Sequence, residues 1–201
     1  MIRAFVFDFG NVICHFEPRL FIEKIAGLTN TPLGTLQEAM QQSFDLGREY
    51  ETGRISSDEF FNRICSRYSI TVEKSAFIDA FTSIFTPIPS TYDLIRHLKP
   101  HYKLGLLSNT NEWHFQYGIQ KVDVYPLFDA VTVSFHVGAM KPSRQIYDDM
   151  VTKLQVSPEE CVYIDDLREN AEAGSWIGMH AIHYTSHDQL LAALRQFDIA
   201  V

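Results

Sequence analysis

Short apolar runs alternate with amphipathic segments over the second half of the chain, and one such run stands near its start. The runs are rich in aromatic and β-branched side chains and are bounded by turn residues, which predicts buried strands. They lie at residues 4–7, 103–107, 130–133, 161–164 and 181–184. Helical periodicity is found at residues 90–98, from about 112, and at 142–154, 169–177 and 188–197. This alternation predicts an α/β fold, a Rossmann-like parallel sheet with helices on both faces.

The segment from residue 15 to residue 86 has a different pattern and contains no convincing strand. Apolar residues recur there at helical spacing, and a Ser-Ser-Asp-Glu sequence has the character of a helix cap. The expected helices span 18–28, 32–44, 56–68 and 72–85, with a polar break at 47–54 and a return linker at 86–90. We therefore expect a helical-bundle cap domain at 15–86, inserted into a core domain made of 1–14 and 87–201.

Composition is that of an ordinary globular protein and argues against several other classes. Of the 201 residues, 46% are hydrophobic and 21% are charged, and no apolar run approaches the roughly 20 residues that span a bilayer. The net charge of -8 comes without the basic stripe of a nucleic-acid-binding protein. The three cysteines are far apart and outside any CxxC pattern, which argues against a disulfide framework or a structural zinc site. We expect a cytoplasmic monomer or small homo-oligomer that binds neither nucleic acid nor membrane.

Polar residues able to carry chemistry follow several of the apolar runs. They are Asp8, the Ser108-Asn109 pair, Lys141 and the Asp165-Asp166 pair. Singly, each has a common structural explanation, because acids and amides cap helices and lysines lie solvated on surfaces. Together they favour a binding site, since the carboxyl ends of parallel strands meet at one edge of the sheet, where α/β proteins bind ligands. Carboxylates there suit Mg²⁺, and a lysine near a helix start suits an anion.

The order and type of these residues resemble the four motifs of the haloacid dehalogenase (HAD) superfamily, most of whose members are phosphohydrolases. The resemblance covers the whole chain, including the insert. The Phe-Asp-Phe-Gly-Asn-Val-Ile sequence at residues 7–13 is most similar to the subgroup of the bacterial alpha-D-glucose-1-phosphate phosphatase and the phosphatase-like domain of soluble epoxide hydrolase. The resemblance implies a Mg²⁺-dependent phosphatase that hydrolyses a small phosphorylated metabolite, with a sugar phosphate favoured, through an aspartyl-phosphate.

The resemblance also implies roles for the acidic residues. Asp8 would be the nucleophile that attacks phosphorus. Mg²⁺ would be bound by Asp8, by the backbone carbonyl of Gly10 and by Asp166, while Asp165 would hold a metal-bound water. An acidic nucleophile can approach an anionic phosphate only when positive charge neutralises the site.

Three further residues would contact the phosphate in this scheme, and one position departs from the family pattern. Ser108 and Asn109 would hydrogen-bond phosphoryl oxygens, and Lys141 would offset negative charge. Gly10 stands where these phosphatases usually have a second Asp, which protonates the leaving group and activates water. Losing general acid–base help typically costs about 10²–10⁴-fold in rate. His15 could replace it if the cap entry folds this side chain inward.

Two alternative functions remain open at this point. A 2-haloacid dehalogenase also lacks the second Asp, and Arg19 is a candidate for binding a substrate carboxylate, although the acid pair argues for a metal. A catalytically weak ligand-binding protein would also be consistent with Gly10. The substrate would be selected by the cap, where Arg48, Tyr50 and Arg54 either contact it or form a solvated turn.

Overall fold

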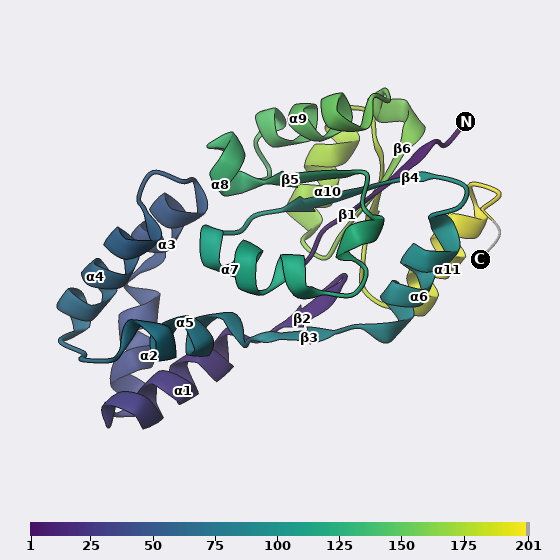
Figure 1. Cartoon of the computed structure of the whole chain (residues 1–201). Helices are drawn as coiled ribbons and strands as arrows, with labels where there is room; N and C mark the ends of the chain where they lie inside the picture. The colour runs from purple at the N-terminus through teal and green to yellow at the C-terminus, as the bar shows by residue number, and fades with distance from the viewer. Residues whose placement is uncertain (200–201) are drawn as a thin grey trace.

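The computed structural model describes residues 1–199 of the chain. Its centre is a five-stranded sheet in the order β5-β4-β1-β6-β7, and all of its pairings are parallel (Figure 1). The strands are β1 Ala4–Phe7, β4 Lys103–Ser108, β5 Ala130–Val133, β6 Cys161–Asp165 and β7 His180–His183. The five apolar runs form the sheet, which confirms the expected α/β class.

The central strand β1 is buried on both faces because helices cover the sheet from both sides. These helices are α6 Pro89–Leu98, α9 Arg144–Leu154, α10 Arg168–Trp176 and α11 His187–Arg195. Phe5 and Phe7 pack in the apolar cluster formed with α6 and α11, whereas Ala4 and Val6 pack in the cluster formed with α9 and α10. This division follows from the two-residue period of a strand. Asp8 therefore leaves the sheet between two buried neighbours, β4 and β6.

Shorter helical elements connect the strands of the core. They are α7 Glu112–Tyr117, α8 Ser134–Val137 and the 3₁₀ turns Ile119–Lys121, Tyr125–Leu127 and Pro158–Glu160. Helix α7 begins at Asn111, whose side-chain oxygen accepts a hydrogen bond from the backbone N–H of His114. Helix α8 was not expected from the sequence, because four residues are too few to show helical periodicity.

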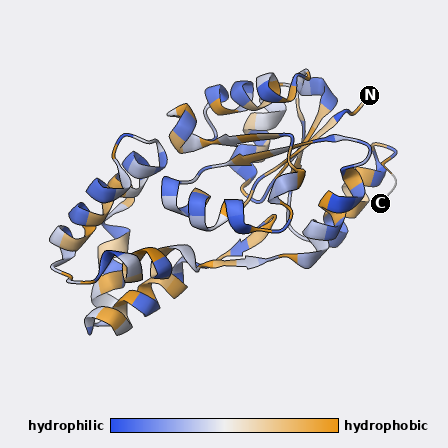
Figure 2. Ribbon diagram, in the orientation of Figure 1, coloured by the Kyte–Doolittle hydropathy of each residue, from blue (hydrophilic) through white to orange (hydrophobic). Residues whose placement is uncertain are grey.

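The insert between β1 and α6 folds as a helical bundle that lies beyond one end of the sheet (Figure 1). Its helices are α1 Pro18–Thr29, α2 Leu33–Gln41, α3 Phe44–Glu51, α4 Ser57–Tyr68 and α5 Lys74–Thr82. Hydrophobic and hydrophilic residues alternate along them, as in amphipathic helices (Figure 2). Their apolar cluster includes Ile25, Phe60 and Phe77, and also Trp113 from α7 of the core. Within residues 1–199, no helix combines the length and apolar character needed to cross a membrane.

The helix expected at 32–44 forms as α2, but its C-terminal bound is wrong, because α2 ends at Gln41 and a second helix, α3, begins at Phe44. The break lies at Ser43, whose hydroxyl donates a hydrogen bond of 2.9 Å to the carbonyl of Ala39. The expected polar break at 47–54 is also wrong, since α3 continues to Glu51. Leu46 and Tyr50 are four residues apart and bury one side of α3, which the many charged residues of this segment obscured.

Two strands absent from the sequence-based prediction connect the bundle to the core. Cys14–Phe16 forms β2 and Phe85–Pro87 forms β3, and the two pair antiparallel where the chain enters and leaves the bundle. Three-residue strands are too short to show alternation, so the sequence predicted a linker at 86–90 where the second strand of this pair, β3, forms. The division into a core of 1–14 and 87–201 and a cap of 15–86 remains our proposal for the domain boundaries.

Candidate active site

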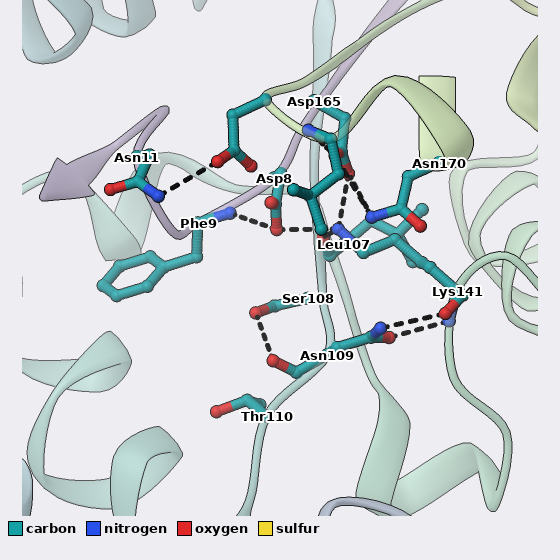
Figure 3. A network of polar contacts seen from close by, with 12 residues as sticks. Asp8, Phe9, Asn11, Leu107, Ser108, Asn109, Thr110, Lys141, Asp165 and Asn170 are labelled. Carbon is teal, nitrogen blue, oxygen red and sulfur yellow. Dashed lines mark hydrogen bonds and ion pairs between the residues drawn. The ribbon is translucent and has the colours of Figure 1, made fainter. Parts of the chain in front are cut away.

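The carboxyl edge of the sheet brings together polar residues that are far apart in the sequence (Figure 3). Asp8 follows β1, Ser108 ends β4 and Asp165 ends β6, and these strands are neighbours in the sheet. Lys141 lies in the loop between α8 and α9 and reaches both Asp8 and Asp165. All four side chains are buried, so any charge they carry must be compensated locally.

The ammonium group of Lys141 is the centre of this arrangement. Its Nζ lies 2.8 Å from Oδ1 of Asp8 and 2.6 Å from Oδ2 of Asp165, and it donates a third hydrogen bond, of 3.2 Å, to the carbonyl of Leu107. Burial alone would lower the pKa of Lys141, but the carboxylates of Asp8 and Asp165 outweigh it and hold this pKa above its ordinary value. Lys141 is therefore a permanent positive charge beside Asp8.

Asp165 is fully buried, and both of its carboxylate oxygens accept hydrogen bonds from protein donors. Its Oδ1 accepts hydrogen bonds from the backbone N–H of Leu167 and from Asn170, at 2.8 and 3.1 Å. Its Oδ2 accepts hydrogen bonds from Lys141 and from the hydroxyl of Tyr163. These contacts fix the position of Lys141. The role of Asp165 in holding a metal-bound water stays a prediction.

Three carboxylates gather at this edge in a way that fits a hard divalent cation. One oxygen from each of Asp8, Asp165 and Asp166 lies within 4.8 Å of the others. Lys141 is the only cation paired with them among residues 1–199, so about two negative charges lack compensation. Burial raises the pKa of Asp8, with Lys141 opposing that effect. Carboxylate oxygens are the ligands that Mg²⁺ prefers, and its double charge would balance the cluster.

A tight turn after β1 carries Gly10 and links the two acidic motifs. Asn11 adopts a left-handed conformation with φ of 53°, and its amide nitrogen donates a hydrogen bond of 3.0 Å to Oδ2 of Asp166. The backbone N–H of Phe9 donates to Oδ1 of Asp8 at 2.7 Å. A Cβ atom added at Gly10 would meet only the Cβ of Phe16, at 3.8 Å. The turn therefore has space for a side chain at position 10.

Ser108 and Asn109 differ in how far their side chains are already engaged. The amide of Asn109 donates a hydrogen bond of 3.0 Å to the carbonyl of Lys141 and accepts one of 2.7 Å from its backbone N–H. Asn109 thus holds the loop that carries Lys141. The hydroxyl of Ser108 makes only a long bond of 3.4 Å to the carbonyl of Asn109, so it remains available to a ligand. Direct phosphate contacts from both residues stay a prediction.

A cavity of about 680 Å³ extends from Lys141 and Asn111 into the helical bundle. Of the cap residues singled out in the sequence, Arg48 and Tyr50 line this cavity, whereas Arg54 is not part of its wall. The cavity is the space in which the non-phosphate part of a ligand could lie, and it falls within the usual 300–1,000 Å³ range of ligand pockets.

The structure does not bring the other two candidate residues to the carboxylates. His15 is an exposed residue of β2, opposite Thr86 of β3. Arg19 is exposed on α1 and forms an ion pair of 2.6 Å with Glu23. Neither side chain therefore supports the role that the sequence left open for it.

Two residues near the site were not predicted from the sequence. Tyr163 donates to Asp165, and the period of two along β6 places residues 163 and 165 on the same face, a signal that was present in the apolar run. Glu51 lines the cavity, and burial raises its pKa to about 7. Nothing in its sequence context indicated burial, because its charged neighbours suggested a solvated turn.

Comparison with known proteins places this geometry in a family. The family model of haloacid dehalogenase-like hydrolases matches residues 2–178. The chain is 28% identical over 189 residues to the D-ribitol-5-phosphate phosphatase of Bacteroides thetaiotaomicron, covering 89% of each chain. It is 24% identical over 196 residues to the sesquiterpene phosphatase astK of Aspergillus oryzae, covering 96% of this chain and 95% of that one.

Other similarities concern part of a longer protein and the fold alone. The drimenol cyclase drtB of Aspergillus calidoustus is 23% identical over 94% of this chain, which spans only 35% of that protein's length. A HAD family enzyme from Bacteroides thetaiotaomicron, solved in complex with magnesium and inorganic phosphate, superimposes with a TM-score of 0.79. It is 22% identical and covers 89% of this chain and 92% of that one. With its sheet, its inserted bundle and the match over residues 2–178, the chain belongs to the haloacid dehalogenase-like hydrolase family.

Proposed function

We propose that this hydrolase is a Mg²⁺-dependent phosphatase that cleaves a phosphate monoester through an aspartyl-phosphate on Asp8. The observation that carries the proposal is the buried ammonium of Lys141, 2.8 Å from Asp8 and 2.6 Å from Asp165, beside a cluster of three carboxylates. A lysine and a divalent cation together supply the positive charge that an anionic substrate requires.

The site residues have separate roles in the proposed reaction. Asp8, Asp166 and the carbonyl of Gly10 would hold Mg²⁺, which supplies Lewis-acid stabilisation of the phosphoryl oxygens when bound. Lys141 and the hydroxyl of Ser108 bind phosphoryl oxygens. Asp165 keeps Lys141 in place.

The bonds made and broken balance as a hydrolysis. A carboxylate oxygen of Asp8 bonds to phosphorus while the ester P–O bond breaks, and the leaving oxygen takes a proton from water because Gly10 offers none. A second water then attacks phosphorus and releases the Asp8 carboxylate together with inorganic phosphate. The proton lost by that water replaces the one taken by the alcohol, so one ester and one water give one alcohol and one phosphate.

The relatives point to two kinds of substrate. The ribitol-5-phosphate phosphatase acts, by its name, on a polyol phosphate, which agrees with the sugar phosphate favoured by the sequence. The sesquiterpene phosphatase acts, by its name, on an apolar substrate. Both are small phosphorylated molecules, and the cavity beside Lys141 is the part of the molecule that would choose between them.

The structural observations favour phosphatase chemistry over the two alternatives. A dehalogenase of the kind considered would need a cap-entry arginine at the site, but Arg19 is at the surface with Glu23. A binding protein that never turns over would not need the buried pairing of Lys141 with the nucleophile position. Beryllium fluoride, which mimics an aspartyl-phosphate, distinguishes this case: a stable complex without phosphate release would support the binding protein.

The test is release of phosphate from p-nitrophenyl phosphate, with Mg²⁺ and with EDTA, by wild type and by Asp8→Asn. We expect metal-dependent turnover that falls to background in Asp8→Asn, because an amide is not a nucleophile here, while the melting temperature changes little. Asp93→Asn, an exposed aspartate on α6, serves as the matched control and keeps full activity. Turnover that persisted in pure Asp8→Asn would remove the nucleophile assignment.

A further inference from the structure

The wall of the cavity is built mainly from hydrocarbon side chains of the cap. They come from α1, α2 and α4, from Phe16 of β2 and from Phe81 of α5. Representative members are Ile22, Ile25 and Leu36. The cavity therefore lies within the apolar interior of the bundle, and hydrocarbon is the material that this interior solvates best.

The same cavity reaches the catalytic edge of the sheet. Lys141, Asn111 and His114 form its end in the core. A ligand whose phosphate lies at Asp8 and Lys141 would extend from there into the bundle. A substrate bound by its phosphate would therefore place its non-phosphate part against the apolar wall.

Most polar atoms in the cap wall are already paired with protein. The hydroxyls of Ser43 and Tyr68 both donate to the carbonyl of Ala39, at 2.9 and 2.5 Å. The hydroxyl of Tyr50 accepts a bond of 3.2 Å from the backbone N–H of Trp113 and also contacts Ser57, which in turn bonds to Glu112 of α7. These groups hold the bundle together and leave few free donors or acceptors for a ligand.

The polar atoms at the core end are also engaged. The Nε2 of His114 donates to the carbonyl of Phe81 at 2.9 Å, since a carbonyl can only accept, and its Nδ1 accepts from the amide of Asn111 at 3.0 Å. Burial lowers the pKa of His114 to about 4, so the ring is neutral. Among the residues that line this end of the cavity, Lys141 alone carries a charge, and its ammonium group would bind the phosphate.

The polar side chains of the wall without a protein partner all lie on α3. They are Asp45, Arg48 and Glu51, of which the first two are exposed. Phe44, which is 77% exposed, and Met40, which is 40% exposed, also line the cavity. They add hydrocarbon surface that an apolar ligand would cover.

We infer that the substrate is the phosphate monoester of a long hydrocarbon alcohol, whose chain fills the cap cavity while its phosphate meets Asp8 and Lys141. The inference rests on the proposed phosphatase function and names its substrate class. A sugar in this cavity would bury several hydroxyl groups, and in the cap wall only Asp45, Arg48 and Glu51 of α3 are free to bond them. Each unsatisfied hydroxyl weakens binding, whereas each methylene buried there strengthens it.

The first experiment measures kcat/KM for butyl, octyl and decyl phosphate against ribitol 5-phosphate and glucose 1-phosphate. We expect kcat/KM to rise about two- to fourfold for each added methylene, mainly through KM, as transfer of hydrocarbon from water predicts. Decyl phosphate should exceed both polyol phosphates. Equal values along the alkyl series, or a preference for the polyol phosphates, would overturn the inference.

A cavity variant and its matched control make the test specific to the bundle. Gly47 of α3 lines the cavity, and an added Cβ there meets nothing within 4 Å, so we expect the side chain of Gly47→Leu to occupy part of the cavity. Gly27 of α1 is equally open to a Cβ but is outside the wall. We expect Gly47→Leu to raise KM for decyl phosphate by about tenfold and for butyl phosphate by much less. Gly27→Leu should change neither value.

Binding of butyl and decyl phosphonate, which cannot be hydrolysed, separates this inference from the proposed function. If p-nitrophenyl phosphate is hydrolysed but chain length has no effect on rate or binding, only the substrate class is wrong. If no compound releases phosphate, the proposed function fails. Calorimetry of phosphonate binding then tests whether the cavity takes an apolar ligand. Tighter binding of decyl than of butyl phosphonate, weakened by Gly47→Leu, would then support an apolar ligand, and equal binding would overturn it.

Discussion

Asp165 and Gly10 show how single residues set the chemistry of this site. Asp165 uses both carboxylate oxygens on protein donors, so that a buried charge serves to hold Lys141 against Asp8. Gly10 has no side chain, so this position cannot donate a proton. In the proposed mechanism Lys141 is a fixed cation for the phosphate and no acid stands at the usual position, which predicts slow turnover of esters with poor leaving groups.

Gly10→Asp tests this at the level of one residue. A Cβ added at Gly10 meets only the Cβ of Phe16, at 3.8 Å, so the backbone at this position tolerates a side chain. We expect the rate on alkyl phosphates, whose alkoxide leaving groups need a proton, to rise by on the order of 10²-fold. The rate on p-nitrophenyl phosphate should rise much less, because its leaving group needs little protonation. No change, or a loss, on alkyl phosphates would mean that another group already supplies the proton.

At the level of elements, α3 joins the bundle to the core. Its end packs on α8, where a Cβ at Gly53 would lie 2.4 Å from the carbonyl oxygen of Phe135, so only glycine fits at this contact. Tyr50 bonds to the backbone of Trp113 at the start of α7. The same helix places Arg48 and Glu51 on the cavity wall, so α3 contacts both the core and the cavity.

Glu51→Gln should make stability less dependent on pH. Burial raises the pKa of Glu51 from 4.5 to about 7, so the folded state favours the protonated carboxyl and loses stability as pH rises between those values. Above pH 7 the cost in wild type approaches about 3 kcal/mol, since each pKa unit is worth about 1.4 kcal/mol. Glutamine removes this cost, so the variant should melt higher than wild type at pH 8 and close to it at pH 4.

Thermal melting from pH 4 to pH 8 measures this difference. A gain of 1 kcal/mol corresponds to roughly 2–4 °C for a chain of this size. Glu38→Gln, an exposed glutamate on α2, is the control and should show no pH-dependent gain. A melting difference for Glu51→Gln that stayed constant with pH would show that the carboxyl is not desolvated in the folded protein.

At the scale of the whole molecule, cap and core close over one edge of the sheet. The β2–β3 pair carries the chain between them, and Trp113 of the core packs in the apolar cluster of the bundle. The acidic cluster lies at the core side of this junction. Uncompensated negative charge in a buried place lowers stability, so a cation that binds there should stabilise the whole fold.

Mg²⁺ should therefore raise the melting temperature relative to EDTA. At a concentration 100 times its Kd, a ligand specific for the folded state adds about 2.7 kcal/mol. Asp166→Asn removes one of the carboxylates and should abolish most of this gain. Asp188→Asn, in the first turn of α11, should keep it. Equal melting temperatures in Mg²⁺ and EDTA for wild type would contradict the metal site.

The local pattern of apolar and polar residues was sufficient to predict the strands of the sheet and the residues that meet at its carboxyl edge. A strand buried on both faces must be apolar at consecutive positions, so the runs around Phe5 and Val162 were visible without any partner. Because parallel strands end at one edge, the positions of Asp8, Ser108 and Asp165 in the sequence already implied their convergence. The family resemblance added roles to these positions.

Tertiary structure alone decided which atoms meet and which surfaces the cap encloses. The β2–β3 pair is too short to be periodic, and the burial of Leu46 and Tyr50 on α3 depends on the surface against which they pack. The sequence could not reveal that Asn109 is engaged by the Lys141 loop, or that Tyr68 and Ser43 both donate to the carbonyl of Ala39. Hydrogen bonds and cavities depend on contacts between residues distant in sequence, and those contacts shape the wall of the cavity that reaches Lys141.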